Sequence, residues 1–133
     1  LSEDFIKEFQ DKIYWINISQ YQILSEEFIR EFQNKVDWHY ISTYQKLSED
    51  FIREFKNKVN WKSISKYQKL SKKFTQEFKD KIYWIILLEK YKYNVYGFND
   101  KYQIKSNNYC SNLLDFPELI KIALNLIALR AFQ

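Results

Sequence analysis

The sequence has few of the residues that form turns, disulfides or catalytic sites. It contains no methionine, one glycine, one proline, one cysteine (Cys110) and one histidine (His39). A single glycine and a single proline argue against a turn-rich β-sandwich or barrel, and one glycine excludes a glycine-rich phosphate loop. One cysteine excludes an intramolecular disulfide and a cysteine zinc site.

The same scarcity bears on catalysis. With one histidine and one cysteine, we expect no metal cluster, no catalytic Cys-His pair and no Ser-His-Asp triad. Carboxylates are plentiful, but they occur where first turns of helices and ion pairs are expected. We therefore expect a protein that is not an enzyme and has no cofactor, and we interpret His39 as an exposed helix residue.

Long apolar runs and targeting signals are also missing. The most apolar segment, 119–132, is interrupted by Lys121, Asn125 and Arg130, and it is shorter than the about 20 residues that span a bilayer. No signal peptide is visible, so we expect no membrane span and no secretion. The absence of methionine leaves open whether further residues lie upstream of Leu1.

What the sequence does contain is a 23-residue unit that occurs four times without gaps. The copies begin at Leu1, Leu24, Leu47 and Leu70, and seven positions are identical in all of them. Internal repeats of this length are typical of stacked helical architectures. In the third copy the identical positions are Leu47, Ser48, Phe51, Glu54, Phe55, Lys58 and Trp61.

The apolar pattern indicates two helices in each unit. Wound at about 100° per residue, the third copy places Phe51 and Phe55 on one stripe. Trp61, Ile64 and Tyr67 then fall on nearly the opposite side. A single straight helix would have two opposed apolar faces, whereas two helices with a break before the tryptophan have one face each.

Helix-capping residues agree with this division. Ser48 is a good N-cap for the first helix, and Asp37 and Asn60 are suited to cap second helices. Glu54 and Lys58 are four residues apart, so we expect them to pair along the first helix.

A unit of this size cannot bury its own apolar faces, but stacked neighbours can bury them together. We therefore predict an all-α fold with no sheet. Residues 1–92 form a short α-solenoid of four 23-residue helix-turn-helix repeats. Residues 93–112 form an irregular linker, and an apolar helix that begins near Pro117 packs as a C-terminal cap, so that 93–133 completes a single domain. A dimerisation helix is the alternative interpretation of this last segment.

The first copy presents an open end. It carries Ile16, Ile18 and Ile23, and no capping segment precedes it. Terminal repeats normally need a polar outer face. We therefore expect this end to be covered by upstream chain, by a partner or by another copy of the protein.

The unit Leu-Ser-Glu-Asp-Phe-Ile-Arg-Glu-Phe-Lys-Asn-Lys-Val-Asn-Trp-Lys-Ser-Ile-Ser-Lys-Tyr-Gln resembles a short tandem repeat that is abundant in proteins of large DNA viruses of amoebae, of the mimivirus and marseillevirus kind. The resemblance covers residues 1 to about 92. It implies a viral protein made in an infected cell, located in the virion or in the host cytoplasm. The resemblance does not indicate which activity the protein has.

A fainter likeness is to the F-box. It rests on the leading leucine, a Phe-Ile pair and the Val-Asp-Trp or Val-Asn-Trp that follows. The F-box has a proline after the leading leucine, where this chain has Ser2 and its equivalents.

Charge is distributed unevenly along the repeats. The first copy has two basic and four acidic residues, whereas the third and fourth each have six basic and three acidic residues. The basic half can bind nucleic acid or an acidic partner, or it can be a solvated surface. The candidate basic patch is Lys56, Lys62, Lys66, Lys69, Lys72, Lys73 and Lys79.

The first helices are nearly identical in copies 1 to 3, even at exposed positions, but the second helices are not. We interpret the repeated Trp and Phe residues as core rather than as a stacking ladder for bases. A partner that docks along the second helices would use the variable positions, with Tyr40 as anchor, and neutral drift is the alternative. The candidate partner-binding residues are His39, Tyr40, Thr43, Lys62, Ser63 and Lys66.

These observations favour a non-enzymatic helical-repeat scaffold, for protein interaction or as a structural component of a virion. Its partners would be proteins, including other virion proteins or further copies of itself. Two alternatives stay open: an F-box-like adaptor directed at the host, and a protein that binds nucleic acid or an acidic partner through its basic half.

Overall fold

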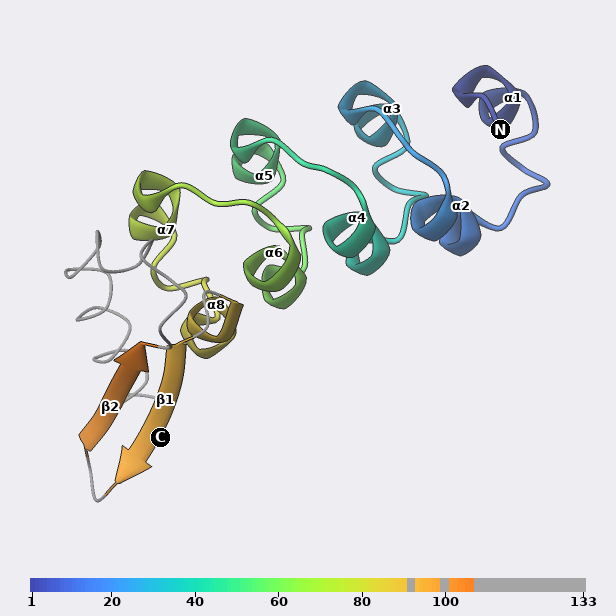
Figure 1. The fold of residues 1–133 in the computed structure, drawn as a ribbon. Coiled ribbons are helices and arrows are strands. Elements are labelled where there is room, and N and C mark those ends of the chain that lie inside the picture. The colour runs from blue at the N-terminus through green and yellow to red at the C-terminus, as the bar shows by residue number, and fades with distance from the viewer. Residues whose placement is uncertain (91–92, 99–100, 107–133) are drawn as a thin grey trace. The chain divides into compact units, whose positions relative to one another are not determined.

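The computed structural model describes residues 1–90, 93–98 and 101–106, and the chain divides into two compact units, residues 1–68 and 69–133. Each of the four copies forms two short helices (Figure 1). The helices are α1 (Glu3–Glu8), α2 (Trp15–Tyr21), α3 (Glu26–Glu31), α4 (Trp38–Tyr44), α5 (Glu49–Glu54), α6 (Trp61–Tyr67), α7 (Lys72–Glu77) and α8 (Trp84–Lys90).

The predicted caps are confirmed. The side chain of Ser48 accepts a hydrogen bond from the backbone N–H of Phe51, and the equivalent serines of the other copies do the same. Asp37 accepts from the first turn of α4, and Asn60 accepts from that of α6. These bonds satisfy backbone donors that have no partner inside the helix, so they fix where each helix begins.

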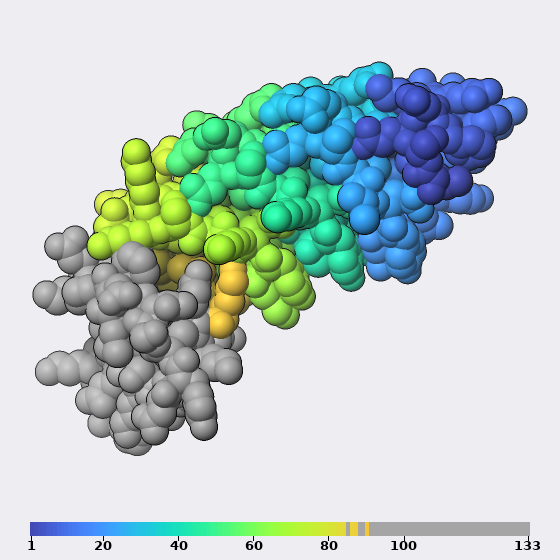
Figure 2. Space-filling view, turned by 45° about the horizontal axis from the view of Figure 1, so that its top comes forward, coloured from blue at the N-terminus to red at the C-terminus, as the bar shows by residue number. Residues whose placement is uncertain are grey.

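Copies 1 to 3 make up the first unit and stack as a short α-solenoid. The second helices α2, α4 and α6 pack side by side in one row, and α1, α3 and α5 form the other row (Figure 1). In the space-filling view these copies, coloured blue to green, form one closely packed body (Figure 2). The predicted repeat fold is thereby confirmed, and its core includes Ile18, Ile41, Ile64, Phe28 and Phe51.

Neighbouring repeats are joined by aromatic stacking. The Trp15 ring centroid lies 5.0 Å from that of Phe32 in the next copy, and Trp38 repeats this with Phe55, also at 5.0 Å. We expected every repeat tryptophan to be largely buried. Trp84 is, with 2% of its surface exposed, but the tryptophans of copies 1 to 3 are only half-buried. Their indole rings lie on the next copy rather than inside their own, so one edge stays near solvent.

Buried glutamines form a second connection between repeats. Gln45 accepts a hydrogen bond from the backbone N–H of Leu24 and donates to the carbonyl oxygens of Ser19 and Gln22. Gln68 makes the same three bonds one repeat later. Each glutamine therefore joins the end of its own second helix to the end of the preceding one.

The second unit departs from the prediction of no sheet. After α8 the chain forms an antiparallel pair, β1 (Tyr93–Phe98) and β2 (Lys101–Ser106), in which Val95 is the partner of Ile104. Aromatic and β-branched residues, which suit strands, are frequent here and alternate with polar ones in β2, but the polar residues and Gly97 suggested an irregular linker. The predicted C-terminal helix and Cys110 lie outside the described residues.

The tryptophan contact can be tested by truncation. We expect Trp38→Ala to lower the free energy of unfolding by about 3 kcal/mol, because it removes the stacking on the next repeat and the bond from the indole N–H to the Gln33 carbonyl. Urea unfolding followed by circular dichroism measures this. Tyr14→Ala is the control, because Tyr14 is 81% exposed and should change stability by less than about 0.5 kcal/mol. Equal effects of the two changes would contradict the stacking model.

The hydrogen bonds of the buried glutamines, which we call the glutamine ladder, can be tested against a matched glutamine of the first copy. Gln45→Ala leaves one buried N–H and two carbonyl groups without their partner, so we expect a loss of at least about 2 kcal/mol. Gln22 occupies the same position in the first copy and is half-buried, and its side-chain oxygen accepts from the Leu1 amino group. Gln22→Ala should cost less than about 0.5 kcal/mol in the same urea titration. A loss of similar size for both variants would show that the ladder does not stabilise the stack.

Candidate binding surface on the second helices

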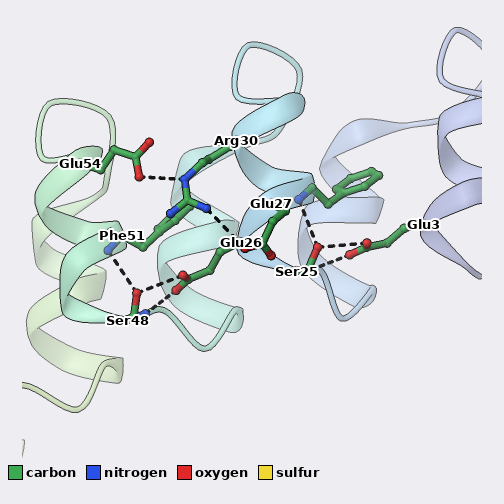
Figure 3. A network of polar contacts seen from close by, with 9 residues as sticks. Glu3, Ser25, Glu26, Glu27, Arg30, Ser48, Phe51 and Glu54 are labelled. Carbon is green, nitrogen blue, oxygen red and sulfur yellow. Dashed lines mark hydrogen bonds and ion pairs between the residues drawn. The ribbon is translucent and has the colours of Figure 1, made fainter.

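The recurring acidic residues of the first helices contact the next repeat. Glu3 accepts hydrogen bonds from the Ser25 backbone N–H at 2.6 Å and from its hydroxyl at 3.0 Å. Glu26 binds Ser48 in the same way, at the same two distances (Figure 3). Because the bound serine is also the N-cap of its helix, each glutamate holds the start of the following repeat in place.

A second set of contacts joins charges on the same row. The Lys7 ammonium lies 2.6 Å from Glu31, and the Arg30 Nε lies 2.8 Å from Glu54 (Figure 3). The hydrogen bond that Lys7 donates to Glu31 raises the pKa of Lys7, and the one that Arg30 donates to Glu54 raises the pKa of Arg30. The expected pair of Glu54 with Lys58 is wrong: α5 ends at Glu54, which turns to the preceding repeat instead.

The recurring lysine that follows each first helix also reaches back. Lys58 Nζ donates to Gln33 Oε1 at 2.8 Å and Asn34 Oδ1 at 3.1 Å in the copy before it. Lys35 does the same to the first copy. Contacts between repeats therefore account for the recurrence of these polar residues, without any external partner.

The second helices differ in composition and in role. The sequences of α2, α4 and α6 contain no aspartate or glutamate. Each helix ends on an exposed tyrosine, and the other exposed positions are Ile16 and Asn17 on α2, His39 on α4, and Lys62 and Lys66 on α6. His39, Lys62 and Lys66 are exposed, as expected, and Tyr40 is half-buried. We call the following set the second-helix surface: His39, Tyr40, Tyr44, Lys62, Lys66 and Tyr67.

Two of the predicted partner-binding residues are not free to bind. The side chain of Ser63 is 4% exposed, and its hydroxyl oxygen lies 3.0 Å from Thr43 Oγ1 on the neighbouring helix. Thr43 also donates to the His39 carbonyl and is half-buried. The prediction was wrong for Ser63 because the neighbouring second helix covers the flank of α6 on which it lies.

Sequence reasoning missed two residues of this surface. Helical periodicity placed Tyr67 on one apolar stripe with Trp61 and Ile64, but it is 52% exposed, and Tyr44, at the equivalent position, is 56% exposed. Each lies at the end of a seven-residue helix, past the point where the neighbouring row covers it.

The surface is aromatic around α4 and cationic on α6. The rings of Tyr40 and Tyr44 stack with centroids 6.0 Å apart at an interplanar angle of 18°, and the His39 ring meets Tyr40 edge-on at 5.4 Å. On α6 the Lys66 ammonium lies 5.1 Å from the Tyr67 ring centroid. Such residues can bury a large area while donating hydrogen bonds and meeting negative charge.

The candidate basic patch divides between the two units. Lys56, Lys62 and Lys66 are exposed in the first unit. The second unit carries the others, of which only Lys72 is half-buried, and their arrangement into one continuous patch stays a prediction. Those residues are Lys69, Lys72, Lys73 and Lys79.

The described part of the chain has no candidate metal site and no candidate membrane span. None of its histidine, cysteine, aspartate and glutamate residues gather in a group of three or more that could hold a metal ion. No described helix is long and apolar enough to cross a membrane. Comparison with known proteins finds no matching family model, no similar curated protein and no similar solved structure.

Proposed function

We propose that this protein is a non-enzymatic repeat scaffold that binds a protein partner through the second-helix surface. The resemblance of its repeats to those of giant viruses of amoebae supports a place in a virion or in the cytoplasm of an infected host cell. Quantitative mass spectrometry of purified particles against infected-cell lysate tests this location. A fixed stoichiometry in particles is the expected result, and absence from particles would contradict the structural role.

The division of contacts between the two rows carries the proposal. The polar residues that recur on the first helices bind the neighbouring repeat, as Glu26 and Arg30 do. Exposed residues that differ between copies lie on the second helices, where His39 and Lys62 hold equivalent positions, and also in the connecting segments, where Asp11 and Asn34 do. A repeat scaffold in which the contacts between copies stay constant, while the exposed residues of one face vary, can present a surface that does not repeat.

The chemistry of this surface points to a protein partner with an acidic region. Tyrosine provides rigid contact area at low cost in side-chain entropy and is enriched at interface hot spots. Tyr40 and Tyr44 support each other by stacking, so a partner meets them already ordered. Lys62 and Lys66 are four residues apart on α6, where they can meet carboxylates of the partner.

Paired substitutions test the interface. We expect Tyr40→Ala with Lys66→Ala to weaken binding by at least about tenfold, because it removes an aromatic anchor and a cation from one surface. The matched control is Tyr14→Ala with Lys46→Ala, which removes an exposed tyrosine and an exposed lysine elsewhere in the unit. Co-purification from infected cells, after circular dichroism has shown intact folding, measures the difference. Full binding by the first variant, or equal loss in the control, would contradict the proposal.

A nucleic acid is the second candidate partner. It is favoured by the exposed Lys62 and Lys66 on α6, because the second helices α2, α4 and α6 contain no aspartate or glutamate. In that case affinity should fall steeply as salt rises, because phosphate binding releases counterions. Replacing Lys62 and Lys66 by glutamate should abolish binding to a labelled oligonucleotide. Binding that is insensitive to both salt and these substitutions would exclude this candidate.

A further inference from the structure

Every internal repeat of the first unit receives a tryptophan from the copy before it. The Trp15 ring lies 6.2 Å from Phe28 and 5.0 Å from Phe32, centroid to centroid. Under this ring Phe28 is 1% exposed, and Phe51, which receives Trp38, is completely buried. The phenylalanine pair of each copy is thus a receptor for the preceding tryptophan.

The first copy has the same receptor without an occupant. Phe5 and Phe9 form the tilted pair found in the other copies, with ring centroids 4.6 Å apart. Yet Phe5 is 43% exposed and Leu1 is 70% exposed, whereas Leu24, the equivalent of Leu1, is 7% exposed. Ile18, which we placed at this end, is buried, and the expectation that the end is covered by upstream chain, a partner or another copy stays a prediction.

The polar groups around this receptor are also in place. Ser2 is equivalent to Ser25, which a glutamate of the preceding copy binds. Glu8 is equivalent to Glu31, which pairs with a preceding lysine, and Lys12 is equivalent to the lysines that reach preceding side-chain amides. Among the described residues, Ser2, Glu8 and Lys12 have no partner from a preceding repeat.

We propose that the outer face of the first copy is a docking site for a further repeat of the same kind. The occupant would place a tryptophan on Phe5 and Phe9, a glutamate on Ser2 and a lysine or arginine on Glu8. The interface would continue the two that already exist between copies 1, 2 and 3.

The required chemistry selects one type of repeat. Copies 1 to 3 have glutamate at their third position and lysine or arginine at their seventh, as Glu26 and Arg30 illustrate. The fourth copy has Lys72 and Gln76 there, so it would bring an ammonium group to Ser2 and no cation to Glu8. The fourth repeat of a second molecule is therefore a poor occupant, and a repeat like copies 1 to 3 is a good one.

The experiment adds one repeat to the full chain. A duplicate of residues 24–46 is joined directly before Leu1, as Lys46 is joined to Leu47. We expect amide hydrogen exchange in α1 to slow by at least about tenfold and binding of an apolar fluorescent dye to fall. The backbone N–H of Ser2 should become protected, because a glutamate would accept its hydrogen bond. Unchanged exchange in α1 and at Ser2 would overturn the proposal.

Two controls change the added repeat alone. The equivalent of Trp38→Ala removes the ring that would cover Phe5, and protection of α1 should then return to that of the unmodified chain. The equivalent of Glu26→Ala leaves the tryptophan in place and should abolish protection of the Ser2 amide only. Full protection of α1 with the tryptophan removed would overturn the contact scheme.

The oligomeric state of the unmodified chain tests a rival occupant. Sedimentation velocity at micromolar concentration should find no association through this face, so Phe5→Ser should leave the result unchanged. A dimer that Phe5→Ser dissociates would identify a second copy as the occupant and would overturn the proposal.

Discussion

The stacking of one tryptophan on the phenylalanine pair of the next repeat is the contact on which the rest of the fold depends. The helices have six or seven residues each, and isolated helices shorter than about 12–15 residues are marginal in water. Their order therefore comes from tertiary contacts. Trp15 and Trp38 supply the apolar part of each junction, and buried Gln45 and Gln68 satisfy the backbone groups that the junction covers.

The sequence predicted interactions between residues close together in the chain better than interactions between residues far apart in it. The caps were predictable because Ser48 and Asn60 bind backbone groups only three residues away. The arginine that binds Glu54 was not predictable, since it is 24 residues away in the sequence. A nearer cation, Lys58, was expected to lie on the same helix, but α5 ends at Glu54. The two-stranded sheet was missed because six-residue strands give a weak signal beside a strong helical repeat.

The candidate site was predicted in part for a related reason. Helical periodicity assigns a direction to a side chain, but it does not show where the neighbouring repeat ends. Ser63 was expected to be exposed, but α4 packs against it and buries it. Tyr67 continues the apolar stripe of its helix, but about half of its surface is exposed. Both positions depend on how the second helices pack side by side, which is a property of at least two copies.

The contacts between repeats have a consequence for how such a chain can change. The contacts that join copies run between adjacent ones, as the bonds of Glu26, Arg30 and Gln45 illustrate. Recombination that gains or loses one whole copy would rejoin matching faces and leave every other junction intact. Insertion of a single residue within a copy would instead shift a tryptophan off its receptor. The array can therefore evolve in length by complete units, while its variable row acquires new side chains one at a time.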